Sequence, residues 1–335
     1  MWQALVPWLL HDAASAAAQA APWNQAMASM EEFEVVSFVT SLNPTALMRT
    51  NLLPQFPLKV TLLGLEPEGS RQWKNLRKVE LLHQHVASLP PSKVVIAIDF
   101  FDVVWLDCQQ DLVQIFRSFD RPLVFSAEVE HYPIAKVAMD RLEEAGGYPH
   151  LPSARGGTAR SIRNKTYKYL NSGCFAGYAN ALHRATGRIL AQRFDNDYVL
   201  RTRLALNDAE RESMLVGSDD QIAWHTYAIH HPGEIALDYG ADMFLSALSF
   251  QLGDFELHGR EVFARPFGHS ICFAHGNGAS NMAAYVAQVQ NLARQLPGLQ
   301  PGNCSEVVED LGYAKVWQLD CRRQILLLRH RLQKR

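Results

Sequence analysis

Apolar runs of strand length alternate with amphipathic segments over the N-terminal part of the chain. Residues 35–40, 58–63 and 93–98 are short runs rich in β-branched residues, which predict buried strands. Residues 46–53 and 73–86 lie between them, and the second of these segments has apolar residues at helical spacing. This order of strand, helix, strand, helix and strand predicts a parallel, doubly wound sheet.

The rest of the pattern predicts further strands and helices, interrupted by one long loop. Residues 140–168 contain six glycines and prolines and several basic residues, which indicates a loop long enough to act as a lid. Ser218, Asp219 and Asp220 are expected to cap a helix that runs to residue 230. We expect further strands at residues 123–126, 174–178, 235–237, 255–257 and 271–274, and further helices at residues 112–116, 181–193 and 280–295.

No internal repeat or clear linker divides the sequence, so we expect a single α/β domain over residues 33–296. Residues 1–32 are expected to be an N-terminal extension. They are rich in alanine and lack the basic start of a signal peptide, so they fit a signal peptide poorly. Residues 297–335 are expected to be a C-terminal tail that ends in a basic helix at residues 322–335.

Composition and charge exclude several classes of protein. Hydrophobic residues make up 48% and charged residues 20% of the chain, which is typical of globular proteins and excludes a disordered one. The 32 basic and 34 acidic residues give a net charge of −2, so nothing indicates a nucleic-acid partner. No apolar run is long enough to predict a transmembrane helix.

The five cysteines form no CxxC pair and show no zinc-site spacing. Cys108, Cys174 and Cys272 lie in apolar stretches, which predicts that they are small buried hydrophobic residues. Cys304 and Cys321 flank a polar segment and would be able to form a disulfide in an oxidising compartment. The sequence alone leaves the compartment open.

An acidic turn follows the predicted strand at residues 93–98. Ligands of parallel sheets bind beyond the carboxyl ends of the strands, where Thr40 ends one predicted strand and Asp99 follows another. Asp99 and Asp102 can converge there on one hard divalent cation, Mn²⁺ or Mg²⁺. The alternative is an acidic turn with one aspartate capping the next helix. A phosphatase of the HAD type also has an aspartate after an apolar strand, but the position of its second aspartate is occupied by Phe101.

A second candidate is the segment His275-Gly276-Asn277-Gly278, which follows the predicted strand at residues 271–274. An imidazole followed by glycines, whose backbone amides can approach a phosphate, suits a site for a metal and a diphosphate. An ordinary glycine-rich turn is the alternative. Each of these motifs is therefore ambiguous when it is taken alone.

Two further motifs are weak in isolation. Asp219 and Asp220 suit a helix N-cap as well as a catalytic site. Asn171-Ser172-Gly173 is interpreted as a segment that precedes a strand.

The order of all these motifs is more specific than any one of them. Over residues 33–285 it closely resembles the glycosyltransferase domain of procollagen lysyl hydroxylases, the PLOD family, and their stand-alone relatives. The resemblance implies a GT-A fold, a Rossmann-like mixed sheet flanked by helices, that binds a UDP-sugar through Mn²⁺. The matching motifs are Asp99-Phe100-Phe101-Asp102, Phe125-Ser126-Ala127-Glu128, Tyr169 to Tyr178, Asp219-Asp220-Gln221 and His275-Gly276-Asn277-Gly278.

The resemblance also implies roles for individual residues. Asp99, Asp102 and His275 match the metal ligands of the family. Asp219, Asp220 and Asn171 match positions that face the donor sugar and the acceptor, and one of the two acids is the candidate for positioning the acceptor or acting as base. Donor-binding positions are matched by Thr40 near the uridine, Lys78 near the phosphates, Asp99, and Gly276, Asn277 and Gly278 along the diphosphate.

The sequence departs from the family pattern at two points. His131-Tyr132-Pro133 replaces Cys-Trp-Pro, and Cys174 replaces the second glycine of Asn-Ser-Gly-Gly. Both departures bear on the sugar and the acceptor more than on the metal.

The sequence is therefore interpreted as a metal-dependent glycosyltransferase that moves glucose or galactose from UDP to a hydroxyl. The acceptor implied by the resemblance is hydroxylysine or galactosyl-hydroxylysine in a collagen-like polypeptide. The alternatives are a catalytically silent domain that binds sugar nucleotides and a metal-dependent phosphohydrolase. The family implies the lumen of the endoplasmic reticulum or Golgi, which residues 1–32 do not support.

Overall fold

The computed structural model of the 335-residue chain describes its central part and two short C-terminal strands. The residues described are 33–38, 59–64, 75–100, 102–106, 108, 110–132, 161–191, 219–258, 261–277, 305–310 and 315–320. Several predictions fall outside these residues: the extension 1–32, the helices at 46–53, 280–295 and 322–335, most of the loop 140–168, Thr40, Gly278, Cys304 and Cys321.

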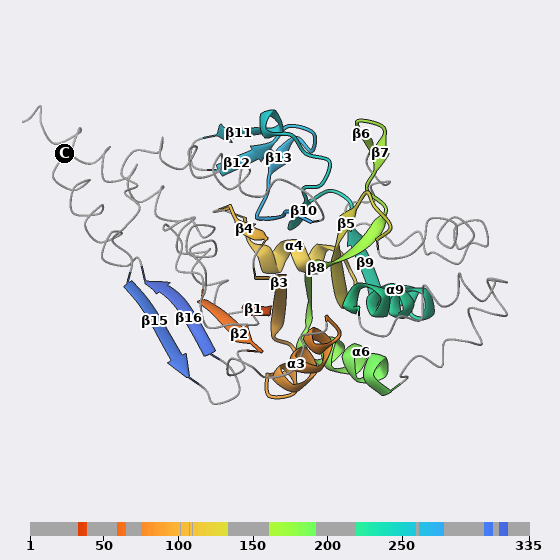
Figure 1. The fold of residues 1–335 in the computed structure, drawn as a ribbon, viewed down its shortest axis with the longest axis vertical. Coiled ribbons are helices and arrows are strands. Elements are labelled where there is room, and N and C mark those ends of the chain that lie inside the picture. The colour runs from red at the N-terminus through yellow and green to blue at the C-terminus, as the bar shows by residue number, and fades with distance from the viewer. Residues whose placement is uncertain are drawn as a thin grey trace, which may run out of the picture.

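An eight-stranded sheet forms the centre of the fold, in the order β15-β16-β2-β1-β3-β8-β5-β9 (Figure 1). Its strands are β1 (Phe33–Phe38), β2 (Lys59–Leu63), β3 (Val94–Asp99), β5 (Leu123–Glu128), β8 (Tyr169–Tyr178), β9 (Ile235–Asp238), β15 (Ser305–Asp310) and β16 (Lys315–Asp320).

The directions of the strands make this sheet a mixed one. β1 pairs in parallel with both β2 and β3, as the strand–helix pattern predicts. β8 then runs antiparallel between β3 and β5, and β9 pairs in parallel with β5. The predicted fold class, a Rossmann-like mixed α/β sheet flanked by helices, is therefore confirmed.

Helices cover both faces of the sheet. Successive side chains of a strand point to opposite faces, so each strand contributes to two cores. Val36 and Val95 pack in one core with α3 (Arg77–Val86), α6 (Ala179–Ala191) and α9 (Asp220–His230). Their neighbours Val35 and Val94 pack in a second core with α4 (Leu112–Ser118). The apolar runs are buried on both faces, which explains why they do not alternate with polar residues.

β8 begins earlier in the sequence than predicted, so Asn171-Ser172-Gly173 lies within the strand and not before it. The pairing with β5 shifts at this point: Phe125 pairs with Phe175, whereas Ser126 pairs with Asn171. Such a bulge leaves extra residues unpaired with the neighbouring strand, bends the chain and turns side chains in new directions. Apolar periodicity marked only the regular part of this strand.

Three smaller sheets lie beside the central one. β14 (Phe273–His275) pairs in parallel with β10 (Phe244–Ser246) and antiparallel with β4 (Val103–Trp105). β11 (Phe255–His258), β12 (Glu261–Ala264) and β13 (His269–Ser270) form an antiparallel sheet, and β6 (Ser161–Ile162) forms a hairpin with β7 (Lys165–Thr166). The single-turn helices are η1 (Pro232–Glu234) and η2 (Leu252–Asp254). His275 is the last residue of β14 and does not follow it as the sequence pattern predicts.

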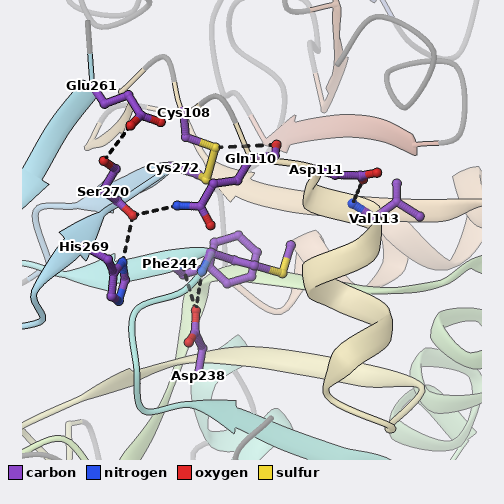
Figure 2. The surroundings of a disulfide bond; sticks show 11 residues. Cys108, Gln110, Asp111, Val113, Asp238, Phe244, Glu261, His269, Ser270 and Cys272 are labelled. Carbon is purple, nitrogen blue, oxygen red and sulfur yellow. Dashed lines mark hydrogen bonds between the residues drawn. A yellow bond between two sulfur atoms is a disulfide. The ribbon is translucent and has the colours of Figure 1, made fainter. Parts of the chain in front are cut away.

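Cys108 and Cys272 are buried, as predicted, but they also form a disulfide, which the sequence pattern did not indicate (Figure 2). The antiparallel pairing of β4 with β14 brings their adjoining segments together, although 164 positions separate the two cysteines. Gln110 reinforces the link by donating from Nε2 to the Ser270 carbonyl over 3.0 Å. Cys174 is buried, as predicted, and its thiol is free.

The segment expected as a C-terminal tail contributes two strands to the central sheet. β16 pairs antiparallel with β2, and β15 pairs antiparallel with β16 at the edge (Figure 1). Among the described residues, no helix has the length and apolar character needed to cross a membrane.

Candidate active site

A cleft of about 610 Å³ opens where β3 and β14 end and where α3 and α9 begin. Both strands have their carboxyl ends here, the edge at which sheets of this kind bind ligands. The cleft collects residues from every motif that the sequence singled out. They are Asn75, Lys78, Asp99, Asp102, Glu128, Glu130, His131, Tyr132, Asn171, Ser172, Gly173, Asp219, Asp220, Gln221, Leu248, His275 and Asn277.

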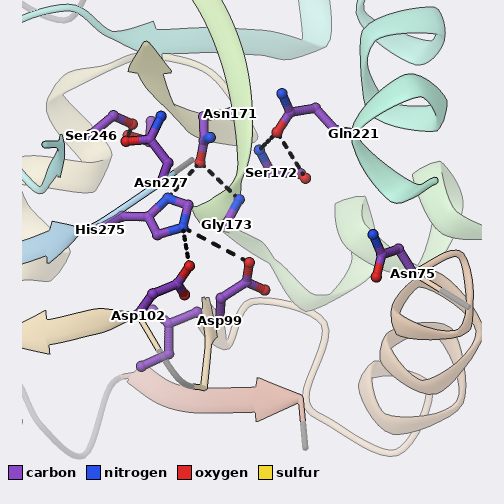
Figure 3. A network of polar contacts seen from close by, with 12 residues as sticks. Asn75, Asp99, Asp102, Asn171, Ser172, Gly173, Gln221, Ser246, His275 and Asn277 are labelled. Atoms are coloured by element: carbon purple, nitrogen blue, oxygen red, sulfur yellow. Dashed lines mark hydrogen bonds and ion pairs between the residues drawn. The ribbon is translucent and has the colours of Figure 1, made fainter. Parts of the chain in front are cut away.

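Asp99, Asp102 and His275 come together on the floor of this cleft (Figure 3). Their ligand atoms all lie within 4.8 Å of one another. Nε2 of His275 is 3.3 Å from Oδ2 of Asp102 and 4.0 Å from Oδ2 of Asp99. Two carboxylates and an imidazole suit a divalent transition-metal cation such as Mn²⁺, so the donor set fits the ion that the resemblance implies.

The backbone holds the turn after β3 against the end of β14. The register of the two strands pairs His275 with Val103, which places Asp102 beside the imidazole. The backbone N–H of Gly276 donates to the Asp102 carbonyl over 2.7 Å. The resemblance places the Gly276 amide along a diphosphate, but in the structure this N–H group already donates a hydrogen bond to the protein itself.

The charges of the cluster reinforce one another. Burial lowers the pKa of His275, but the carboxylates of Asp102 and Asp99 raise it by more, so the net shift is upward. Burial raises the pKa of Asp102, whereas His275 and Lys78 lower it by more, so this carboxyl stays ionised. A metal cation requires ionised carboxylates and a neutral imidazole, so its binding would release the proton that the two aspartates favour on His275.

Lys78 joins this cluster from the first turn of α3. Its Nζ donates to Oδ1 of Asp99 over 2.6 Å and lies 3.6 Å from Oδ2 of Asp220. Burial lowers the pKa of Lys78, but the two carboxylates raise it by more, so the amine keeps its charge. The cleft therefore has a fixed positive charge next to the carboxylates that would hold a metal.

Asp219 and Asp220 have different surroundings although they are adjacent. Asp219 is the N-cap of α9: its Oδ1 accepts from the backbone N–H groups of Gln221 and Ile222, and its Oδ2 accepts from Asn75. Asp220 is buried, and burial raises its pKa to about 6 although Lys78 opposes the shift. Asp219 thus caps α9 and also lines the cleft, whereas Asp220 lies beside Lys78 among the charged residues of the cleft.

Glu128, which was not among the site residues predicted from the sequence, lies at the centre of a buried network. Gln221 donates to its Oε1 over 2.7 Å, and Asn277 donates to its Oε2 over 2.6 Å. Burial raises the pKa of Glu128 to about 7, although hydrogen bonds from Asn171, Gln221 and Asn277 oppose the shift. Two signals were available: Glu128 ends the matching motif Phe125-Ser126-Ala127-Glu128, and it is a charged residue just after the predicted strand at residues 123–126.

The remaining sequence candidates are distributed as follows. Asn277 lines the cleft, but its side chain is engaged by Glu128 and by the backbone N–H of Leu248. Tyr132, in the position where the family has tryptophan, is 68% exposed at the cleft. Thr40 and Gly278 lie outside the described residues, so their expected contacts with a donor stay predictions.

A family model described as the PLOD GT domain matches residues 36–291, which is more than half of the chain. The chain belongs to the PLOD glycosyltransferase-domain family. The resemblance stated from the motifs is thereby confirmed, and the cleft lies within the matched residues.

Curated relatives of this PLOD-family chain are longer proteins. Procollagen-lysine,2-oxoglutarate 5-dioxygenase 1 of Mus musculus is 28% identical over 191 residues, which cover 56% of the chain and 21% of that protein. The Rattus norvegicus protein of the same name is 27% identical over 225 residues, which cover 66% of the chain and 25% of that protein. The chain thus matches about a quarter or less of their length.

Among solved structures, mouse xyloside xylosyltransferase 1 in its apo form aligns with 74% of the chain and 98% of its own. The two share 11% sequence identity and a TM-score of 0.41.

Proposed function

We propose that this chain transfers a hexose, glucose or galactose, from a UDP-sugar to a hydroxyl group, with Mn²⁺ held by Asp99, Asp102 and His275. The convergence of these three side chains with Lys78 in one cleft, inside a glycosyltransferase domain, carries the proposal. A divalent cation bound there would act as a Lewis acid that stabilises the charge of the departing UDP.

The charged floor of the cleft binds and orients the donor. Lys78 supplies a fixed charge beside the position of the diphosphate, and its salt bridges hold it in place before the donor arrives. Asp220, buried next to Lys78, faces the donor sugar. Groups that are already ordered bind a ligand without a further loss of side-chain entropy.

The rim of the cleft binds the acceptor. Asp219 and Tyr132 both lie on its lining, and Asp219 is only partly buried. During transfer the bond from the sugar C1 to the β-phosphate oxygen of UDP breaks, and a bond from C1 to the acceptor oxygen forms. The Asp219 carboxylate orients the acceptor hydroxyl and accepts its proton, as a positioned base does.

The proposed acceptor class is hydroxylysine or galactosyl-hydroxylysine in a collagen-like polypeptide. Family membership supports this class, since the curated relatives are named as enzymes of procollagen lysine. The exposed Tyr132 offers an aromatic face with a polar tip at the mouth of the cleft, suited to an amphipathic acceptor.

The test is a donor screen with the purified full chain. UDP release is measured with UDP-glucose and UDP-galactose, with and without Mn²⁺, and with peptides that contain lysine, hydroxylysine or galactosyl-hydroxylysine. We expect release that needs Mn²⁺ and is stimulated by a hydroxylated peptide, with a mass increase of one hexose on that peptide. Asp102→Ala serves as the inactive control.

Three results would contradict the proposal in different ways. Binding of UDP-sugar without turnover with any acceptor would identify a silent sugar-nucleotide-binding domain. Release of phosphate without transfer would identify a phosphohydrolase. Transfer that is unaffected by a chelator would exclude the metal.

A further inference from the structure

The bulged part of β8 forms a cradle around the His275 imidazole. Oδ1 of Asn171 lies 2.9 Å from Nδ1 of His275, on the side of the ring opposite to the two aspartates (Figure 3). The same oxygen also accepts the backbone N–H of Gly173 over 2.9 Å. Asn171 and His275 are 3% and 4% exposed, so no bulk water competes for these contacts.

These contacts determine which nitrogen of the imidazole carries the proton. The Gly173 N–H can only donate, so the Asn171 atom that faces it is the oxygen and not the amide nitrogen. The Asn171 side chain also hydrogen-bonds to the Glu128 carboxylate, which accepts from the amide nitrogen on that side. Because this oxygen is an acceptor, Nδ1 of His275 must be the donor. The other ring nitrogen, Nε2, faces Asp99 and Asp102.

Gly173 contributes to the cradle by having no side chain. A Cβ atom at this position would lie 2.1 Å from Cε1 and 2.6 Å from Nδ1 of His275. Such a contact is impossible without moving the imidazole, because β14 fixes the backbone of His275 between β10 and β4. The ring therefore packs directly on the backbone of β8.

We propose that Asn171 and Gly173 are positioning residues that hold His275 as the Nδ1-protonated tautomer, with Nε2 presented to a metal between the two aspartates. This inference rests on the proposed function for the metal itself. It assigns Asn171 to the support of a ligand, in place of a direct contact with the donor sugar or acceptor. Histidine ligands of metals commonly have such a partner on the second nitrogen, and its loss costs about 10–100-fold in metal affinity.

The first measurement is made on the metal-free wild-type chain and needs no variant that perturbs the cradle. Nitrogen-15 NMR at a pH where the imidazole is neutral distinguishes the two tautomers, and the His275 signal is identified by its absence from His275→Gln. We expect the proton on Nδ1. A proton on Nε2 would overturn the proposal whatever the chain does with metal.

The second measurement is Mn²⁺ affinity by calorimetry. We expect Asn171→Ala to weaken Mn²⁺ binding by about 10–100-fold and to populate the Nε2-protonated tautomer. Asn180→Ala is the matched control, because Asn180 is exposed near the start of α6. We expect Gly173→Ala to weaken binding as well, whereas Gly253→Ala, with nothing within 4 Å of the added Cβ, leaves it unchanged.

The outcomes separate this inference from the proposed function. A wild-type chain that binds no Mn²⁺ but shows the Nδ1-protonated tautomer would contradict the metal site and leave the cradle as a structural feature only. Mn²⁺ binding by wild type that is unchanged in folded Asn171→Ala, with an unchanged tautomer, would overturn the inference and leave the proposed function standing. Circular dichroism establishes that each variant is folded.

Discussion

Lys78 donates a hydrogen bond to Asp99 across 2.6 Å, and the same ammonium lies 3.6 Å from Asp220. The Lys78 side chain is 15% exposed, and the side chains of Asp99 and Asp220 are 22% and 5% exposed, so solvent screens these ion pairs little. One cation from α3 thus links an expected metal ligand on β3 to the first residue of α9. Removal of one partner from such a group leaves buried charge unpaired, which is strongly destabilising.

We therefore expect Lys78→Met to lower the free energy of unfolding by about 3–5 kcal/mol, measured by urea denaturation. Asp220→Asn combined with Lys78→Met should recover part of this loss, because it removes one of the two unpaired carboxylates. Lys165→Met is the control: Lys165 pairs with Glu130 where both side chains are about half exposed, so its loss should cost less than about 1 kcal/mol. Equal losses for the two lysines would contradict the prediction.

Replacement of each expected metal ligand should remove binding of Mn²⁺ and of UDP that depends on it. Asp99→Ala, Asp102→Ala and His275→Ala each delete one ligand atom, and we expect losses larger than the roughly 10–100-fold typical of supporting residues. Calorimetry with UDP and Mn²⁺ measures the effect. UDP affinity that stays unchanged in all three folded variants would exclude this metal site.

The two adjacent aspartates should behave differently when each is changed to asparagine. Asparagine is as good an N-cap as aspartate, so Asp219→Asn should keep the stability of the fold within about 0.5 kcal/mol and lower transfer if Asp219 is the base. Asp220→Asn removes a carboxylate from Lys78 and should lower donor binding. Separate measurements of kcat and KM for the donor distinguish the two effects, and full activity in both variants would leave only the capping role.

Reduction of the Cys108–Cys272 disulfide should loosen the strands that hold the metal ligands. The disulfide joins the segments next to β4 and β14. β4 begins directly after Asp102, and β14 contains His275. We expect the Cys108→Ala/Cys272→Ala variant to lose about 2–5 kcal/mol of stability and to bind Mn²⁺ more weakly. A reductant should lower the Tm of wild type and leave this double variant unchanged. A reductant effect of the same size in the variant would assign the effect to another disulfide.

Acid should destabilise the fold through His225, which is fully buried in α9. Burial, with a smaller contribution from His131, lowers the pKa of His225 to about 3. The unfolded chain takes up this proton near pH 6.5 and the folded chain does not, so stability falls as pH drops below about 6.5, by at most about 1.4 kcal/mol per pH unit.

His225→Gln and His225→Met carry no titrating group at this position. Both should show a smaller loss of stability between about pH 7 and pH 5 than wild type in urea denaturation. The comparison uses the slope with pH and not the absolute stability, since either substitution also changes the packing. An unchanged slope in both variants would contradict the assignment.

Local sequence determined the strands and the kinds of side chain at their ends. The runs at residues 35–40, 58–63 and 93–98 are mostly apolar without alternation because both faces of the sheet are covered. This local signal predicted the bounds of β1, β2 and β3 to within two residues. Asp99 and His275 were singled out for the same reason, since each marks where an apolar run becomes polar. The alternation of strands and helices likewise indicated an α/β sheet.

Only the tertiary structure decided which of these strand ends meet. Asn171 and His275 are 104 positions apart, and they touch because β8 bulges against β5 and turns Asn171 toward β14. The bond between Cys108 and Cys272 depends in the same way on the pairing of β4 with β14. Local periodicity determines which face of the sheet a side chain lies on, but which distant strands become neighbours depends on the packing of the whole sheet. The sequence therefore determined which side chains lie at the strand ends, and the long-range strand pairing decided which of them form the site.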